Sequence, residues 1–321
     1  MPQIIAANGI NLSVTVQGEG PLVILMHGWP ELALSWRHQI PALVAAGYQV
    51  AAPDMRGYGD SDKPHETAAY TLDIIADDME AIAAHLGAVK WVAIGHDWGA
   101  PVAWRCALRF PNQVAAVFCL SVPHSGPPPI PFFDIIEARY PDQFFYMRYF
   151  QQEGVAEAEF EQAGWIPALK RVFYMGSGQG VANRSGRRVP RDSTMLASVD
   201  DPPPGPMPFM SDDELHQYAA AFEKSGFRGP LSWYRNFPQN AADARAYGDN
   251  VIRQPAGFLA GDREMVLAML PGQLENLRQK CTDLRAEIIL KGDVGHWVQQ
   301  ERPNEVNEAL ITFLNGVRDR L

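Results

Sequence analysis

The chain has 321 residues, of which 47% are hydrophobic and 20% charged, so it is long enough for one large domain or for a core with a second module. This composition excludes a chain that is mainly disordered or fibrous. The 37 acidic and 27 basic side chains leave a formal charge of −10, which argues against a nucleic-acid partner or an anionic membrane surface, because phosphates would be repelled. A neutral or apolar small molecule fits this charge better.

The cysteines and the apolar runs indicate the cellular compartment in which we expect the protein. Cys106, Cys119 and Cys281 are widely spaced and form no Cys-x-x-Cys or Cys/His cluster, so the sequence indicates neither a disulfide framework nor a zinc site. Residues 1–14 lack a basic stretch followed by a long apolar run, and no apolar run approaches the roughly 18 residues of a transmembrane helix. We therefore expect a cytoplasmic protein with no membrane partner. The sequence leaves the oligomeric state open, a homodimer included.

The predicted elements follow an alternating order along the chain. Asn8-Gly9 stands between two short alternating stretches, which predicts antiparallel strands joined by a two-residue turn. Continuous apolar runs typical of strands buried on both faces follow at 22–26, 48–53, 89–95 and 114–122. Helical spacing of apolar side chains predicts a helix over 71–87, and the pattern resumes with a strand at 256–261, a helix near 267–280, a strand at 287–290 and a helix at 304–318. The alternation predicts an α/β fold with a mostly parallel central sheet flanked by helices.

The stretch 126–247 breaks this rhythm. It is rich in aromatic residues and helix-like segments and contains proline clusters at 127–131 and 201–206. We interpret it as an inserted helical cap, so that 1–125 is the first part of the core and 248–321 the second. Within the cap, residues 176–192 are rich in glycine and polar side chains, which predicts a mobile loop.

A nucleophile-elbow motif is the most informative feature of the sequence. Gly95-His96-Asp97-Trp98-Gly99 directly follows an apolar strand and directly precedes a helix-like stretch. Small residues on either side of the central position allow the sharp turn that projects its side chain. Asp97 occupies the position where an esterase has serine, and a carboxylate can displace a leaving group at an sp³ carbon to form an alkyl ester. An aspartate that only caps the following helix is the alternative interpretation.

Three loops after predicted strands carry the remaining candidates. His27-Gly28-Trp29-Pro30 follows the first buried strand, and the backbone N–H groups of Trp29 and Trp98 are the expected oxyanion donors. His296 follows the last predicted strand, the position of the base in this topology. Asp262 and Glu264 both follow the preceding strand, and either is a candidate for the acid that orients His296.

The loop HGWPE (27–31) and the elbow GHDWG (95–99) resemble those of the soluble epoxide hydrolases of the α/β-hydrolase superfamily. The motifs that carry the resemblance span nearly the whole chain; they are HGWPE (27–31), DMRGYGDSDKP (54–64), GHDWG (95–99), YFQQEGVAEAEFE (149–161), SGFRGPLSWYRN (225–236) and GHWVQQERPNEVN (295–307). The resemblance implies an α/β-hydrolase fold with a helical cap, and it implies Glu264 as the acid, where the family more commonly has aspartate. It also implies that Tyr146 and Tyr234 of the cap hydrogen-bond the epoxide oxygen.

The reaction that the resemblance implies needs no cofactor and no metal. Asp97 would open an apolar epoxide, and water activated by His296 would hydrolyse the alkyl ester to release a vicinal diol. Four aromatic residues are candidates to line an apolar substrate pocket, although core packing explains them equally well; they are Trp36, Phe133, Trp233 and Phe258. Two alternatives stay open at this stage: a haloalkane dehalogenase that uses the same aspartate, and a non-catalytic ligand-binding protein with this fold.

Overall fold

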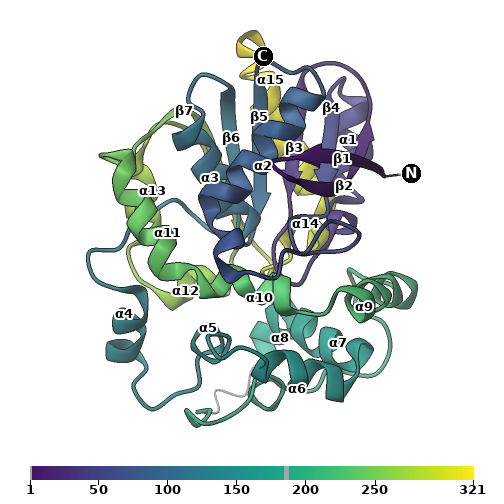
Figure 1. The fold of residues 1–321 in the computed structure, drawn as a ribbon, viewed down its shortest axis with the longest axis vertical. Coiled ribbons are helices and arrows are strands. Elements are labelled where there is room, and N and C mark those ends of the chain that lie inside the picture. The colour runs from purple at the N-terminus through teal and green to yellow at the C-terminus, as the bar shows by residue number, and fades with distance from the viewer. Residues whose placement is uncertain (1, 184–187) are drawn as a thin grey trace.

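The computed structural model of the protein describes residues 2–183 and 188–321, and in this part of the chain eight strands form one sheet in the order β1-β2-β4-β3-β5-β6-β7-β8 (Figure 1). The first two pairings, β1 with β2 and β2 with β4, are antiparallel, and all the others are parallel. The strands are β1 (Gln3–Ala7), β2 (Ile10–Gln17), β3 (Leu22–Met26), β4 (Gln49–Pro53), β5 (Trp91–His96), β6 (Val114–Leu120), β7 (Ile252–Gly261) and β8 (Cys281–Leu290). The predicted α/β class is confirmed.

The opening hairpin turns as its sequence predicts. Ala7 pairs with Ile10, so only Asn8 and Gly9 form the turn. Their φ angles of 48° and 79° are both positive, which is the geometry that matches the twist of the two strands.

Helices of the core cover both faces of the sheet (Figure 1). The helices α2 (Leu72–His85) and α3 (Gly99–Arg109) pack together over one face, and α1 (Gln39–Ala45) and α15 (Pro303–Asn315) over the other. The short helix α14 (Val298–Glu301) leads into α15. Because both faces are covered, the central strands β3, β5 and β6 are almost entirely buried, which explains their continuous apolar runs.

The second part of the core differs in detail from its prediction. The helix expected near 267–280 is two helices, α12 (Met265–Met269) and α13 (Gln273–Lys280), because Pro271 and Gly272 interrupt it. The strand expected at 287–290 begins earlier, at Cys281. β8 is the edge strand and is largely half-buried, so its first half carries polar and charged residues that do not resemble a buried strand.

The chain between β6 and β7 is helical and lies mainly beyond the carboxyl ends of the parallel strands (Figure 1). Its helices are α4 (Phe132–Arg139), α5 (Tyr146–Tyr149), α6 (Val155–Ala163), α7 (Trp165–Gly176), α8 (Gly178–Asn183), α9 (Asp212–Ser225), α10 (Arg228–Arg235) and α11 (Phe237–Ala244). The domain boundaries at 126 and 247 stay a prediction. Short 3₁₀ turns complete the described secondary structure at Ala33–Trp36, Thr67–Tyr70, Leu196–Ser198, Arg245–Tyr247 and Arg318–Arg320.

The prediction of a mobile loop over 176–192 was wrong for its first part. Residues 178–183 form α8, and Gly176, Gly178 and Gly180 are buried. Close packing explains these glycines, because a Cβ on Gly178 would lie 1.6 Å from the carbonyl oxygen of Asp293. Residues 184–187, which belong to the same prediction, lie outside the described residues.

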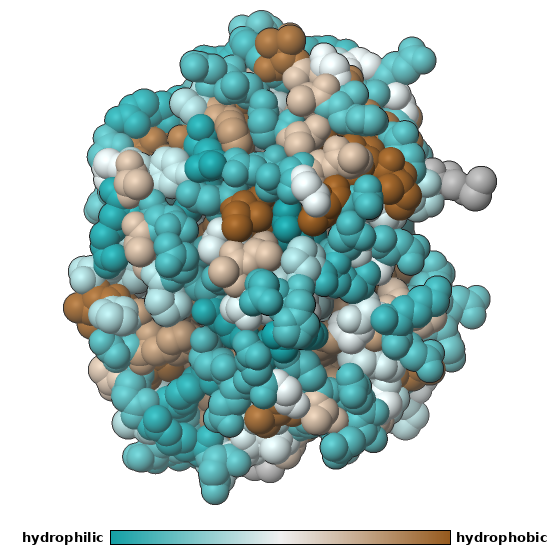
Figure 2. All heavy atoms as spheres, in the orientation of Figure 1, coloured by the Kyte–Doolittle hydropathy of each residue, from teal (hydrophilic) through white to brown (hydrophobic). Residues whose placement is uncertain are grey.

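The surface is mixed in polarity. Figure 2 shows one face on which hydrophilic residues predominate and hydrophobic residues occur in scattered groups. No helix of the described residues has the length and apolarity needed to cross a membrane.

Candidate active site

The elbow stands at the carboxyl end of β5. β5 ends at His96 and α3 begins at Gly99, and between them Asp97 has a φ of 50°, in the left-handed region that side chains rarely adopt. A Cβ on Gly95 would lie 2.0 Å from the carbonyl oxygen of Gly99, and a Cβ on Gly99 would lie 2.0 Å from that of Met26. The sharp turn therefore requires both glycines, and it presents Asp97 beyond the end of the strand.

The two carboxylate oxygens of Asp97 have different partners. The backbone N–H of Trp29 donates to Oδ1 at 2.7 Å, and Nε2 of His296 lies 3.2 Å from Oδ2. Gly28 permits this approach of the loop after β3, because a Cβ there would lie 2.2 Å from Oδ1. The structure thus brings Asp97, His296 and the Trp29 N–H together. Trp98 directly follows Asp97. That its backbone N–H is the second oxyanion donor stays a prediction.

Glu264 faces His296 from the end of β7. Its Oε1 and Oε2 lie 2.9 and 3.1 Å from Nδ1 of His296, and Oε1 also accepts a hydrogen bond from the N–H of Val266 at the start of α12. Asp262 is exposed and instead accepts hydrogen bonds from the N–H groups of Gly292 and Val294. Of the two acids that the spacing left open, only Glu264 is in contact with the histidine.

The charges of these three side chains depend on one another. Burial acts to lower the pKa of His296, but the carboxylates of Glu264 and Asp97 outweigh it and raise that pKa well above its usual value. Burial acts to raise the pKa of both carboxyl groups, but His296 together with nearby hydrogen-bond donors outweighs it and lowers both. The two carboxylates therefore favour the protonated form of the histidine. Loss of the charge on Asp97 would remove one of the two groups that raise the pKa of His296.

The two predicted tyrosines come from separate cap helices and lie close together. The ring centroids of Tyr146 in α5 and Tyr234 in α10 are 6.0 Å apart, and Tyr234 lies 5.1 Å from the ring of Trp98. Burial raises the pKa of both phenols well above its usual value, and the Asp97 carboxylate acts in the same direction. Both side chains therefore stay protonated and able to donate a hydrogen bond.

A buried ionic network behind the site was not predicted from the sequence. Oε2 of Glu31 lies 2.7 Å from Nδ1 of His96, while Oε1 accepts hydrogen bonds from the side-chain amides of Gln299 and Gln300. Nε2 of His96 lies 2.7 Å from the carbonyl oxygen of His296. Because a carboxylate and a carbonyl can only accept, both ring nitrogens of His96 have an acceptor to donate to.

This network joins three loops of the site, namely those that carry Trp29, Asp97 and His296. Burial acts to raise the pKa of Glu31, but His96, His27 and the Gly28 N–H together outweigh it and lower that pKa, which favours the ionised form. The glutamate directly after HGWP was the available signal, since a charged side chain between a buried strand and an apolar segment needs a partner.

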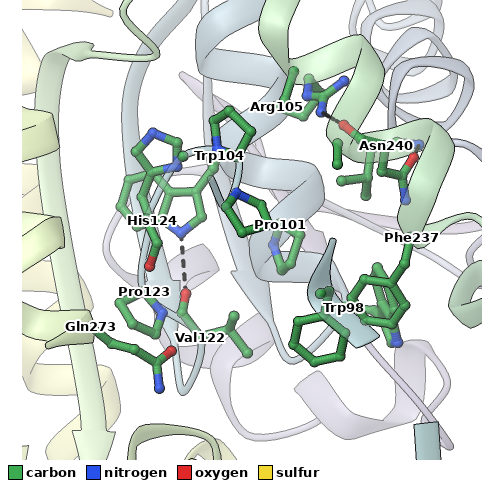
Figure 3. Close-up of a pocket in the computed structure, with 18 of the residues that line it drawn as sticks. Trp98, Pro101, Trp104, Arg105, Val122, Pro123, His124, Phe237, Asn240 and Gln273 are labelled. Carbon is green, nitrogen blue, oxygen red and sulfur yellow. Dashed lines mark hydrogen bonds between the residues drawn. The ribbon is translucent and has the colours of Figure 1, made fainter. Parts of the chain in front are cut away.

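A cavity of about 290 Å³ has Asp97 and Tyr234 in its lining. Figure 3 shows other lining residues, among them Trp98 and Phe237. The lining is mainly apolar and includes Trp98, Phe132 and Phe237, the last two of which are stacked with ring centroids 4.6 Å apart. Besides Asp97 and Tyr234, the lining has polar side chains that the sequence analysis did not assign to the pocket; they are Arg105, His124, Ser125, Asn240, Asn250 and Gln273. Arg105 and Trp104 donate to backbone carbonyls of Asn240 and Val122, as Figure 3 shows.

The four aromatic residues predicted for the pocket are not among the described residues that line this cavity. Trp36 is fully buried on the face of the sheet covered by α1 and α15, and Phe258 is fully buried in β7. Trp233 donates from its indole to the carbonyl oxygen of Arg56, and Phe133 packs against Phe237 just outside the lining. A core aromatic and a pocket aromatic give the same sequence pattern, so the pocket role of these four residues stays a prediction that this cavity does not support.

Comparison with known proteins agrees with this geometry. Residues 21–303 match the family described as the α/β hydrolase fold. Epoxide hydrolase A of Mycobacterium tuberculosis is 38% identical over 331 residues, covering 99% of this chain and 98% of the relative. Epoxide hydrolase 3 of Siraitia grosvenorii is 34% identical, and 97% of each chain is covered. The crystal structure of epoxide hydrolase A from Mycobacterium thermoresistibile superimposes with a TM-score of 0.91 at 40% identity, covering 98% of each chain.

With its covered parallel sheet and the elbow at the end of β5, the protein is a hydrolase of the α/β-hydrolase superfamily. Within that superfamily the chain belongs to the epoxide hydrolases, which act on the ether bond of an oxirane. The resemblance that the motifs carry is confirmed. Among the described residues, no group of three or more His, Cys, Asp and Glu side chains is arranged to hold a metal ion.

Proposed function

We propose that the protein converts an apolar epoxide to a vicinal diol through an alkyl ester on Asp97. One observation carries the proposal: the Trp29 N–H holds Oδ1 of Asp97 while Oδ2 faces His296 at the edge of an apolar cavity. Such an arrangement fixes Oδ1 by a backbone donor and leaves Oδ2, whose partner is the His296 side chain, as the oxygen that attacks.

In the first half-reaction Oδ2 of Asp97 attacks a carbon of the oxirane. The new bond joins Oδ2 to that carbon, and the carbon–oxygen bond of the ring breaks with its electron pair going to the epoxide oxygen. Tyr146 and Tyr234 stabilise this oxygen by hydrogen bonds, and one phenol supplies the proton that makes it a hydroxyl group. The raised pKa of both phenols supports this role, because each donor stays protonated beside Asp97.

In the second half-reaction water hydrolyses the ester. Once Asp97 is esterified its charge is gone, so one of the two carboxylates that raise the pKa of His296 no longer acts. His296 then gives up its Nε2 proton, which returns by way of solvent to the phenolate left by the first half-reaction. Neutral His296, oriented by Glu264, removes a proton from water that attacks Cγ of Asp97. The former carbonyl oxygen, Oδ1, becomes the oxyanion where the Trp29 N–H already donates. The Cγ–Oδ2 bond then breaks with its electron pair going to Oδ2, which takes the proton of the new Cγ–OH group and leaves as a hydroxyl group of the diol. Asp97 is again a carboxylate and His296 is again protonated.

The proposal is tested by incubating the purified protein with a panel of aryl and alkyl epoxides and haloalkanes. We expect diol from the epoxides and no halide from the haloalkanes. Halide release without diol would instead support the dehalogenase alternative, and saturable binding without either product would support a binding protein.

Substitution of Glu264 tests which acid orients the base. In Glu264→Gln an amide N–H would face Nδ1 of His296 and favour the wrong tautomer, so we expect kcat to fall about 10²- to 10⁴-fold. Asp262→Asn is the matched control, because Asp262 lies on the same loop without touching His296. Steady-state kinetics of the two variants check this, and a larger loss in Asp262→Asn would contradict the assignment.

Substitution of the tyrosines tests the first half-reaction. Tyr146→Phe and Tyr234→Phe each remove one donor to the opening oxygen, and we expect alkylation to slow about 10²-fold in each variant and further in the double variant. Tyr149→Phe is a matched control on α5, because the Tyr149 hydroxyl donates to Glu159 instead. Single-turnover quenching measures the alkylation rate. Unchanged alkylation in both single variants would exclude these phenols as the donors.

The pH dependence should differ between the two half-reactions. The pKa of Asp97 is lowered, so alkylation should persist below the usual aspartate range. Hydrolysis needs neutral His296 and should decline as pH falls through the pKa of that histidine in the ester, because the cation cannot take a proton. The ester should therefore accumulate at low pH, which mass spectrometry of acid-quenched enzyme detects. If the rate constants of alkylation and hydrolysis declined over the same acidic pH range, Asp97 and His296 would not have separate roles.

A further inference from the structure

The glycine-rich end of α7 and start of α8 packs directly on the loop that carries His296. The backbone N–H of His296 donates to the carbonyl oxygen of Gly176 at 2.7 Å. A Cβ on Gly295 would lie 2.4 Å from that same oxygen, and a Cβ on Gly178 would lie 1.6 Å from the carbonyl oxygen of Asp293. Two backbone segments that are far apart in the sequence thus lie so close together that only glycine fits at their contact.

The carboxylate of Glu301, in α14, bridges these two backbones. Its Oε2 accepts a hydrogen bond from the N–H of Gly178 at 2.8 Å and another from the N–H of Gly295 at 3.2 Å. Its Oε1 is buried and has no hydrogen-bond partner among the described residues. Burial raises the pKa of Glu301, while the N–H groups of Gly178 and Gly295 oppose this rise. The Trp297 backbone N–H and the charge on His296 act in the same direction as these two N–H groups. Burying a carboxylate costs free energy of desolvation, and both hydrogen bonds that the Glu301 side chain accepts belong to this bridge.

From these contacts we infer that Glu301 is a positioning residue for the base, which ties the cap segment at Gly176–Gly178 to the loop before His296. The inference rests on the proposed function, in which His296 acts only in the second half-reaction. On the core side, the His296 carbonyl accepts from Ser121 Oγ at 2.9 Å, and Glu264 holds its side chain. The bridge at Glu301 holds the loop of His296 from the side of the cap.

This position predicts an effect confined to one half-reaction. Asp97 is placed by the elbow and by the Trp29 N–H, and its contact with His296 is made by the imidazole, which Glu264 holds. We therefore expect alkylation to depend on the bridge much less than hydrolysis does. Hydrolysis depends on the distance from His296 to a water at Cγ of Asp97, and a misplacement of about 1 Å can cost about 10²-fold. A residue needed only for folding would impair both half-reactions together.

The experiment measures the rate constants of alkylation and hydrolysis separately, by single-turnover quenching and mass spectrometry, in the full-length enzyme with an epoxide that the wild type converts. We expect Glu301→Ala to lower the hydrolysis rate constant between about tenfold and about 10²-fold, to leave alkylation within about twofold, and to accumulate the ester. Glu301→Gln keeps an oxygen for the two N–H groups and should restore most of the hydrolysis rate. Glu305→Ala, at an exposed acid in α15, should match the wild type.

A second variant keeps the inference testable if Glu301→Ala does not fold. Gly178→Ala forces the cap segment away from Asp293 with Glu301 intact, and it should reproduce the slow hydrolysis. Equal losses in both half-reactions, or unchanged hydrolysis in a folded Glu301→Ala, would overturn the inference. A wild type that forms neither ester nor diol with any epoxide would instead refute the proposed function itself.

Discussion

Asp97→Asn is expected to abolish diol formation and to leave no ester on the enzyme. An amide is not a nucleophile toward an oxirane at neutral pH, so kcat should fall by about 10⁴-fold or more, the scale at which loss of a covalent nucleophile acts. Asparagine is the better replacement than alanine, because Asp97 has a φ of 50° and asparagine tolerates that region. The elbow and the cavity should keep their shape. Mass spectrometry after incubation with epoxide and a diol assay measure the two effects.

Two controls separate loss of the nucleophile from loss of the fold. The thermal unfolding of Asp97→Asn should stay cooperative, and Asp134→Asn, at an exposed acid in α4, should keep wild-type turnover. Substantial diol from a folded Asp97→Asn would mean that water attacks the epoxide directly or that another residue is the nucleophile.

His296→Gln is expected to stop the reaction halfway. Asp97 keeps its donor from Trp29 and can still open the ring, but no base remains to activate water, so kcat should fall about 10²- to 10⁴-fold. One equivalent of epoxide per enzyme should be consumed, and the mass of the protein should rise by the mass of the epoxide. A burst assay with intact-protein mass spectrometry measures both.

His216→Gln, at an exposed histidine of the cap helix α9, is the matched control and should turn over normally. If His296→Gln instead slowed the burst as strongly as the steady state, the histidine would be needed for alkylation, and the division of roles between Asp97 and His296 would be wrong.

Local rules were sufficient to predict the fold and the positions that meet at the elbow. Covered parallel strands need apolar runs, and a sharp strand-to-helix turn needs Gly95 and Gly99, so both features can be read from a short window of sequence. Spacing alone did not decide between Asp262 and Glu264. The decision depends on which carboxylate reaches His296, and that contact joins residues that are 32 positions apart.

Contacts between distant segments account for the features that sequence reasoning missed. The glycines at 176 and 178 were interpreted as a sign of mobility, whereas they allow the cap backbone to touch the loop of His296. Trp36 was expected in the pocket, but the face of the sheet on which it lies depends on how the chain turns after β3. Glu31 and His96 are 65 positions apart, and the sequence around each residue does not indicate which residue it pairs with.

The central claim is that Asp97 forms an ester whose Cγ–Oδ2 bond is cleaved by water, and a single turnover in H₂¹⁸O tests it most directly. With enzyme in excess over epoxide, the account predicts a diol without ¹⁸O, because its new oxygen comes from Asp97, and one ¹⁸O in the peptide that contains Asp97. A first-turnover diol that carries ¹⁸O, together with an unlabelled Asp97 peptide, would contradict the account, because water would then have attacked the epoxide directly.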